Sequence, residues 1–73
     1  MSAIPARDQV TVNGDPTRVP ENATIGGLLA ALNIRPERVV VELNGAIHRR
    51  GEGLDSRLVA GDVVEIVHFV GGG

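Results

Sequence analysis

The sequence predicts an α+β domain in which a mixed sheet of four to five strands packs around one helix. Two Asn-Gly dipeptides, Asn13-Gly14 and Asn44-Gly45, each join short runs of strand-like composition and predict hairpins, the first with the positive φ of a tight type I′ turn. One stretch with the apolar spacing of a helix, residues 25–32, lies between the two hairpins. The 73 residues are enough for one domain with a small aliphatic core.

The first hairpin is predicted from residues 9–12, in which polar and apolar side chains alternate before the Asn13-Gly14 turn. Its return strand, residues 15–19, contains Pro16 and ends at Pro20. Because proline has no N–H to donate to a neighbouring strand, this return strand is expected at an edge of the sheet.

The helix is predicted to begin after Thr24, a good N-cap residue, and to be stopped by Asn33 and then Pro36. Its apolar side chains recur on one helical face, at Ile25, Leu28, Leu29 and Leu32. Gly26 and Gly27 in its first turn each cost about 1 kcal/mol relative to alanine. We interpret them either as sites of close packing against the sheet or as residues that the fold merely tolerates.

The second hairpin combines a β-branched run at residues 39–43 with a short return strand at residues 46–48. Because the helix crosses over between the two hairpins, the first and last strands are expected side by side and parallel in the middle of the sheet. This order of strands and helix is the β-grasp arrangement. It leaves the carboxyl end of the central strand free to project outward.

The segment at residues 51–61 has only one apolar pair at helical spacing, Leu54 and Leu58, so we predict a loop with at most one helical turn. Gly61-Asp62 then turns the chain into the last apolar strand, residues 63–70. Asp62 is expected to stabilise this turn through hydrogen bonds to the backbone.

Composition excludes several classes of function. The chain has no cysteine, which excludes disulfides, thiolate catalysis and cysteine-ligated zinc. All seven basic residues are arginine, so a phosphate-binding loop lysine and a Schiff-base lysine are also excluded. A net charge of −2 and a single aromatic residue argue against nucleic-acid binding. No metal is assigned to His48 and His68, and no apolar run approaches the about 20 residues of a membrane span, so a cytoplasmic protein is expected.

The last strand runs directly into three glycines, Gly71, Gly72 and Gly73. Two terminal glycines would arise by chance in about 0.5% of chains. Without a Cβ, three such residues form a slim, flexible tail of about 10 Å that can pass through a narrow channel. We therefore predict an exposed tail at residues 71–73 of a single domain spanning residues 1–73, with the Gly73 carboxylate presented to another protein's active site. The alternative is an idle, frayed terminus.

Three segments of the sequence resemble the ThiS family, the sulfur carrier proteins of thiamine biosynthesis. They are VELNGAIHRR at residues 41–50, LVAGDVVEIV at residues 58–67 and FVGGG at residues 69–73. The family ends in two glycines, to which Gly72 and Gly73 correspond. The related small subunit of molybdopterin synthase is longer and carries aromatic or proline residues before its glycines, whereas this chain has VHFV.

The resemblance implies a carrier rather than an enzyme, with its chemistry on Gly73. An E1-like adenylyltransferase of the ThiF type would use ATP and magnesium to form an acyl-adenylate there. Sulfur from a persulfide, supplied by a donor such as a cysteine desulfurase, would then leave a thiocarboxylate for thiazole synthase of the ThiG type. Gly71 and Gly72 would thread into these partners, and no tightly bound cofactor is implied.

Docking also requires a surface. If Val64 and Ile66 face the helix, strand alternation places Glu65, Val67 and Phe69 on the opposite face, near the tail. An apolar pair at that position suits a partner-binding surface. The alternative is a strand turned over, with Phe69 buried.

Two other functions are open at this point. The first is a β-grasp carrier that uses the same thiocarboxylate for molybdopterin, cysteine or thiolated nucleosides, or a modifier conjugated through Gly73. The second is a pure interaction module in which the sheet face binds and the glycines are idle. A neighbouring thiazole synthase gene would argue against the first, and a loss of function on truncation of Gly72 and Gly73 would argue against the second.

Overall fold

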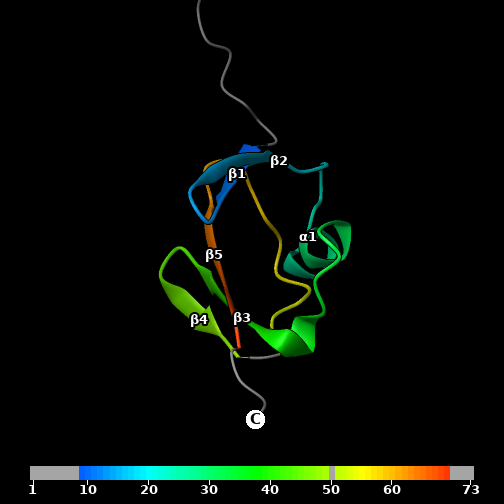
Figure 1. Cartoon of the computed structure of the whole chain (residues 1–73). Helices are drawn as coiled ribbons and strands as arrows, with labels where there is room; N and C mark the ends of the chain where they lie inside the picture. Colours follow the sequence, from blue (N-terminus) through cyan, green and yellow to red (C-terminus); the bar gives the residue numbers. More distant parts are fainter. Residues whose placement is uncertain (1–8, 50, 70–73) are drawn as a thin grey trace, which may run out of the picture.

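The predicted order of strands and helix is confirmed by a computed structural model, which describes residues 9–49 and 51–69 (Figure 1). The elements in chain order are β1 (Gln9–Val12), β2 (Asp15–Arg18), α1 (Ile25–Ala31), η1 (Pro36–Arg38), β3 (Val39–Leu43), β4 (Ala46–His48) and β5 (Val63–His68). The 3-10 helix η1 was not predicted, because proline was taken only as a helix stop. Pro36 instead occupies the first turn of η1, where a backbone N–H would have no partner within the helix, so its absence costs nothing.

The five strands form one sheet in the order β2-β1-β5-β3-β4. Strand β1 is parallel to β5, and the pairs β1–β2, β3–β4 and β3–β5 are antiparallel. Pro16 therefore lies on an edge strand, as predicted. Figure 1 shows β5 running between the two hairpins, which is the β-grasp arrangement.

The first Asn-Gly turn has the positive φ values that were predicted for it, and the second turn has the same conformation. Asn13 and Gly14 have φ values of 49° and 87°, and Asn44 and Gly45 have φ values of 51° and 88°. Two consecutive residues with positive φ define the turn whose twist matches that of the flanking strands.

Helix α1 begins where the sequence indicated, since the Thr24 hydroxyl oxygen accepts a hydrogen bond from the Gly27 N–H at 3.0 Å. A Cβ on Gly26 would lie 3.1 Å from the carbonyl oxygen of Leu54. The close packing at Gly26 is therefore against the loop that follows β4, and of the two interpretations the one of packing against the sheet is wrong for this residue. At Gly27 the nearest neighbour of such a Cβ would be the Thr24 hydroxyl at 3.4 Å.

The loop from residue 51 to residue 61 contains turns and an isolated bridge between Thr24 and Arg57, and no helical turn. It follows the start of α1 closely, because the N–H of Gly26 donates to Leu54 O at 2.7 Å and the N–H of Leu58 donates to Ala23 O at 2.9 Å. Leu58 is buried and Leu54 is partly buried. The apolar spacing of this pair thus comes from covering one end of the core.

The core lies between the sheet and α1, with the loop closing one side. Its buried apolar residues are Val10, Val12, Val19, Ala23, Ile25, Leu28, Leu29, Val39, Val41, Leu58, Val64 and Ile66. Leu32, the last residue of the predicted apolar face of the helix, is 41% exposed because it already belongs to the C-cap. No helix in the described part of the chain has the length and apolar character needed to cross a bilayer.

Candidate functional site

The side chains of β5 alternate between the core and the surface. Val64 is 0% exposed and Ile66 is 7% exposed, whereas Val67 is 60% and Phe69 is 50% exposed. Glu65 is exposed as well. The predicted alternation is confirmed, and the turned-over strand with Phe69 buried is wrong.

The residues predicted to carry the chemistry, Gly71, Gly72 and Gly73, lie outside the described residues. The structure does place the strand that leads to them. The Phe69 N–H donates to the Arg38 carbonyl oxygen in η1 at 3.0 Å, one residue beyond the end of β5. The path of the chain is therefore fixed as far as Phe69.

An open depression of about 340 Å³ lies where β5 ends. Its lining residues come from the segment after α1, from η1 and from the end of β5, and are Asn33, Ile34, Arg35, Arg38, His68 and Phe69. Two exposed guanidinium groups thus flank the base of the predicted tail. A surface of this sign favours acidic groups of a partner.

On the side of the sheet away from α1, the register brings together residues of β3, β4 and β5. We call this surface the outer face, and its members are Val40, Glu42, Ile47, Val63, Glu65 and Val67. Val40 is directly opposite Val67, and Glu42 is directly opposite Glu65. Ile47 is paired with Glu42 from the other side and is 68% exposed. Apolar side chains of all three strands therefore flank a central pair of carboxylates.

The two turn asparagines hold β5 in place through their side chains. Asn13 Oδ1 accepts a hydrogen bond from the Ile66 N–H at 2.7 Å, and Asn44 Oδ1 accepts one from the Val63 N–H at 2.9 Å. The Asn13 amide also donates to Ile66 O at 3.4 Å. The sequence around these asparagines predicts turns alone, and nothing near them indicates that their side chains also bind β5.

The turn that starts β5 is stabilised by Asp62, as predicted. Asp62 Oδ2 accepts a hydrogen bond from the Val59 N–H at 2.8 Å, and Oδ1 accepts one from the Asn44 side-chain amide at 3.0 Å. The carboxylate therefore links the loop to the second hairpin. These two hydrogen bonds fix the position where β5 begins, which is a structural role for Asp62 and not a catalytic one.

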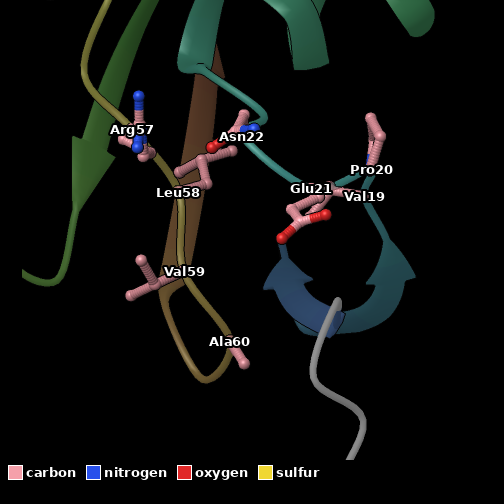
Figure 2. A pocket seen from close by; sticks show the side chains of 8 residues that line it. All are labelled: Val19, Pro20, Glu21, Asn22, Arg57, Leu58, Val59 and Ala60. Atoms are coloured by element: carbon pink, nitrogen blue, oxygen red, sulfur yellow. The ribbon is translucent and has the colours of Figure 1, made fainter.

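A second depression, of about 630 Å³, lies between the segment after β2 and the loop before β5 (Figure 2). It is lined by Val19, Pro20, Glu21, Asn22, Arg57, Leu58, Val59 and Ala60. Figure 2 shows Glu21 and Arg57, its two charged residues, on opposite segments. Glu65, Val67 and Phe69, the predicted site residues that the structure describes, do not line it. Within residues 9–49 and 51–69, no group of three His, Asp or Glu side chains could hold a metal ion.

The similarity to known proteins extends over all of the residues that the structure describes. The sequence profile described as the ThiS family matches residues 5–73. The protein named sulfur carrier protein ThiS from Bacillus subtilis is 42% identical over 53 residues, which cover 73% of this chain and 80% of that protein. The crystal structure of the thiamine biosynthesis protein (ThiS) from Geobacter metallireducens superposes with a TM-score of 0.72 at 40% identity, over 89% of this chain and 99% of that one.

A further relative is much longer than this chain. The protein named thiazole synthase from Magnetococcus marinus is 40% identical over 65 residues, which are 89% of this chain. The chain spans only 20% of the length of that relative.

Proposed function

The chain belongs to the ThiS family of sulfur carrier proteins, and we propose that it carries sulfur as a thiocarboxylate on Gly73 for the thiazole of thiamine. The observation that carries this proposal is that the match to the family runs through residue 73, and so includes the predicted glycine tail. The described residues support it, because Val67 near the end of β5 and Phe69 just after it are exposed and precede the tail closely in the sequence. A carrier of this kind is a protein co-substrate and not an enzyme.

The chemistry starts from a carboxylate, which is a poor electrophile. An E1-like partner would let a Gly73 carboxylate oxygen attack the α-phosphorus of ATP, and pyrophosphate would leave. A persulfide sulfur would then attack the carbonyl carbon of the acyl-adenylate and displace AMP. A second thiol would break the S–S bond of the resulting acyl disulfide, which releases the thiocarboxylate and leaves a disulfide on the donor side.

The glycines serve this chemistry through what they lack. Side chains are absent at Gly72 and Gly73, so the terminal carbonyl is unhindered and the tail fits a narrow channel. Reactive geometry in an active site is sensitive to displacements of about 1 Å. The same tail must visit two active sites in turn, one that activates it and one that accepts its sulfur.

Thiazole synthase is the acceptor that we propose. A segment 40% identical to this chain forms part of the Magnetococcus marinus protein that bears this name. Joining two proteins in one chain raises the effective concentration of each for the other. The relative therefore supports a working partnership between a carrier of this type and a thiazole synthase.

The proposal is tested by intact mass measurement after incubation with ATP, magnesium, the activating enzyme of the same genome and a sulfur donor. We expect a mass gain equal to the replacement of one oxygen by sulfur, located at Gly73. The mass of the protein isolated from its host also establishes whether Gly73 is the carboxyl terminus. Transfer of the sulfur to a product of the thiazole synthase would then identify the acceptor.

The matched control is Gly73→Val, which adds a branched side chain at the α-carbon next to the reacting carboxyl group. We expect this variant to fold normally and to be adenylated at least about 100-fold more slowly. Normal adenylation of Gly73→Val, or no mass change with an activating enzyme proven active on another carrier, would refute the role of the tail. The second result would favour the pure interaction module.

A further inference from the structure

The centre of the outer face holds two carboxylates of adjacent strands side by side. Glu42 of β3 and Glu65 of β5 are directly opposite each other in the antiparallel register. Residues in this relation have Cβ atoms about 4.5–5.5 Å apart, and like charges there destabilise the sheet. The pair is therefore unfavourable for the chain on its own.

Nothing in the described part of the chain compensates for this repulsion. Beyond the backbone pairing of their strands, neither the Glu42 nor the Glu65 carboxylate has a hydrogen bond or an ion pair with any described residue. Their neighbours on the outer face are apolar, with Val40 and Val67 on one side and Ile47 beyond Glu42. The two negative charges thus stand on an apolar surface without a cation of their own.

A surface with this pattern fits a partner of defined chemistry. The exposed apolar side chains Ile47, Val63 and Val67 are the part that loses water when a partner binds. Once water is excluded, two adjacent carboxylates are costly unless a cation lies between them. A guanidinium matches this requirement best, because its planar fork can donate to two carboxylates at once.

We propose that the outer face docks onto the activating enzyme around an arginine of that enzyme, which bridges Glu42 and Glu65 while apolar side chains pack around it. The inference rests on the proposed function and names the chemistry of its first partner. Val67 lies on the outer face near the end of β5, and Phe69, one residue beyond β5, is 50% exposed and close in the sequence to the predicted tail. A partner seated on the carboxylate pair therefore lies next to the chain segment that it must activate.

The pair also makes the face selective. An uncharged apolar partner surface would bury both carboxylates without a partner, and an acidic one would add repulsion. Replacing the carboxylates by amides is therefore expected to strengthen the free chain and to weaken docking. A purely structural role for the two glutamates would move both properties in the same direction.

The experiment measures the affinity of the purified activating enzyme by calorimetry for the unmodified chain and for Glu42→Gln, Glu65→Gln and Glu65→Lys. We expect each amide variant to bind at least about tenfold more weakly and Glu65→Lys to bind more weakly still. The affinity of the variants should also depend less on salt. In ATP-pyrophosphate exchange the KM for the carrier should rise with little change in kcat, and the Tm of each free variant should equal or exceed that of the unmodified chain.

The control is Glu21→Gln, which removes the same charge from an exposed position outside the outer face. It should leave affinity and KM unchanged. Equal affinities for the unmodified chain and the Glu42 and Glu65 variants would overturn this inference and leave the proposed function standing. If the unmodified chain neither binds the activating enzyme nor is adenylated by it, the proposed function fails and this inference fails with it.

Discussion

The two faces of β5 are alike in residue type and differ completely in environment. Val64 and Ile66 are buried on one face, whereas Val63 and Val67 are 44% and 60% exposed on the other. Helix α1 and the loop before β5 cover the first face, and no described element covers the second. Apolar character alone therefore does not tell which residues hold this fold together.

The difference separates residues that stabilise the fold from residues that are available to bind a partner. The buried face stabilises the domain by removing apolar surface from water, at about 25 cal/mol per Å². The outer face contributes little to folding and carries a like-charge pair, Glu42 and Glu65, that opposes it. Residues that destabilise the folded domain are expected at functional sites, such as a surface that binds a partner.

The largest expected effect is a difference in stability between substitutions on the two faces of β5. Ile66→Ala should lower the free energy of unfolding by about 2–5 kcal/mol, because it leaves a cavity in the core. Val67→Ala, one position along the chain, should change it by less than about 0.5 kcal/mol. Urea denaturation of both variants measures the contrast. Equal losses would show that the outer face also stabilises the domain.

The next effect concerns the edge of β5 rather than its faces. Asn13→Ala should cost about 1–3 kcal/mol of unfolding free energy, because the Ile66 N–H loses its acceptor at 2.7 Å and the turn loses a residue suited to positive φ. Asn13→Asp keeps both the acceptor and the turn preference. It should therefore retain most of the stability, and a loss as large as that of Asn13→Ala would contradict this account.

A smaller effect is expected for Phe69, and it concerns the affinity for the activating enzyme rather than the stability of the domain. Phe69→Ala should reduce the affinity for the activating enzyme about tenfold, since exposed aromatic residues at an interface contribute strongly. The Tm of the free variant should change little. Titration calorimetry alongside thermal unfolding distinguishes the two properties, and an unchanged affinity would remove Phe69 from the docking surface.

The smallest effect comes from the helix that covers the buried face. Gly27→Ala should raise stability by about 0.5–1 kcal/mol, because alanine is the better helix former and its Cβ would meet only the Thr24 hydroxyl at 3.4 Å. Gly26→Ala should bring no such gain, since its Cβ would lie 3.1 Å from Leu54 O. Thermal unfolding of this pair measures how tightly the loop is packed on α1. A gain at both positions would mean that the loop yields easily.

Much of the candidate site could be predicted because its determinants are short-range. The glycine tail is identified from the sequence alone, and the exposure of Glu65 and Val67 follows from the two-residue period of a strand. The basic depression at Arg35 and Arg38 could not be predicted in this way. It exists because η1 folds beside the end of β5, and the bond from the Phe69 N–H to Arg38 O joins residues far apart in the chain.

The sequence by itself determined the two Asn-Gly turns, the Thr24 cap and the edge position of Pro16, since each depends on the φ preference or hydrogen-bonding groups of a few adjacent residues. Only the tertiary structure decided that the Asn13 amide bonds Ile66, 53 positions away, and that Glu42 stands opposite Glu65. Such contacts depend on the register between strands. That register is set where strands from distant parts of the chain pack their apolar faces together against α1, which no single segment can specify alone.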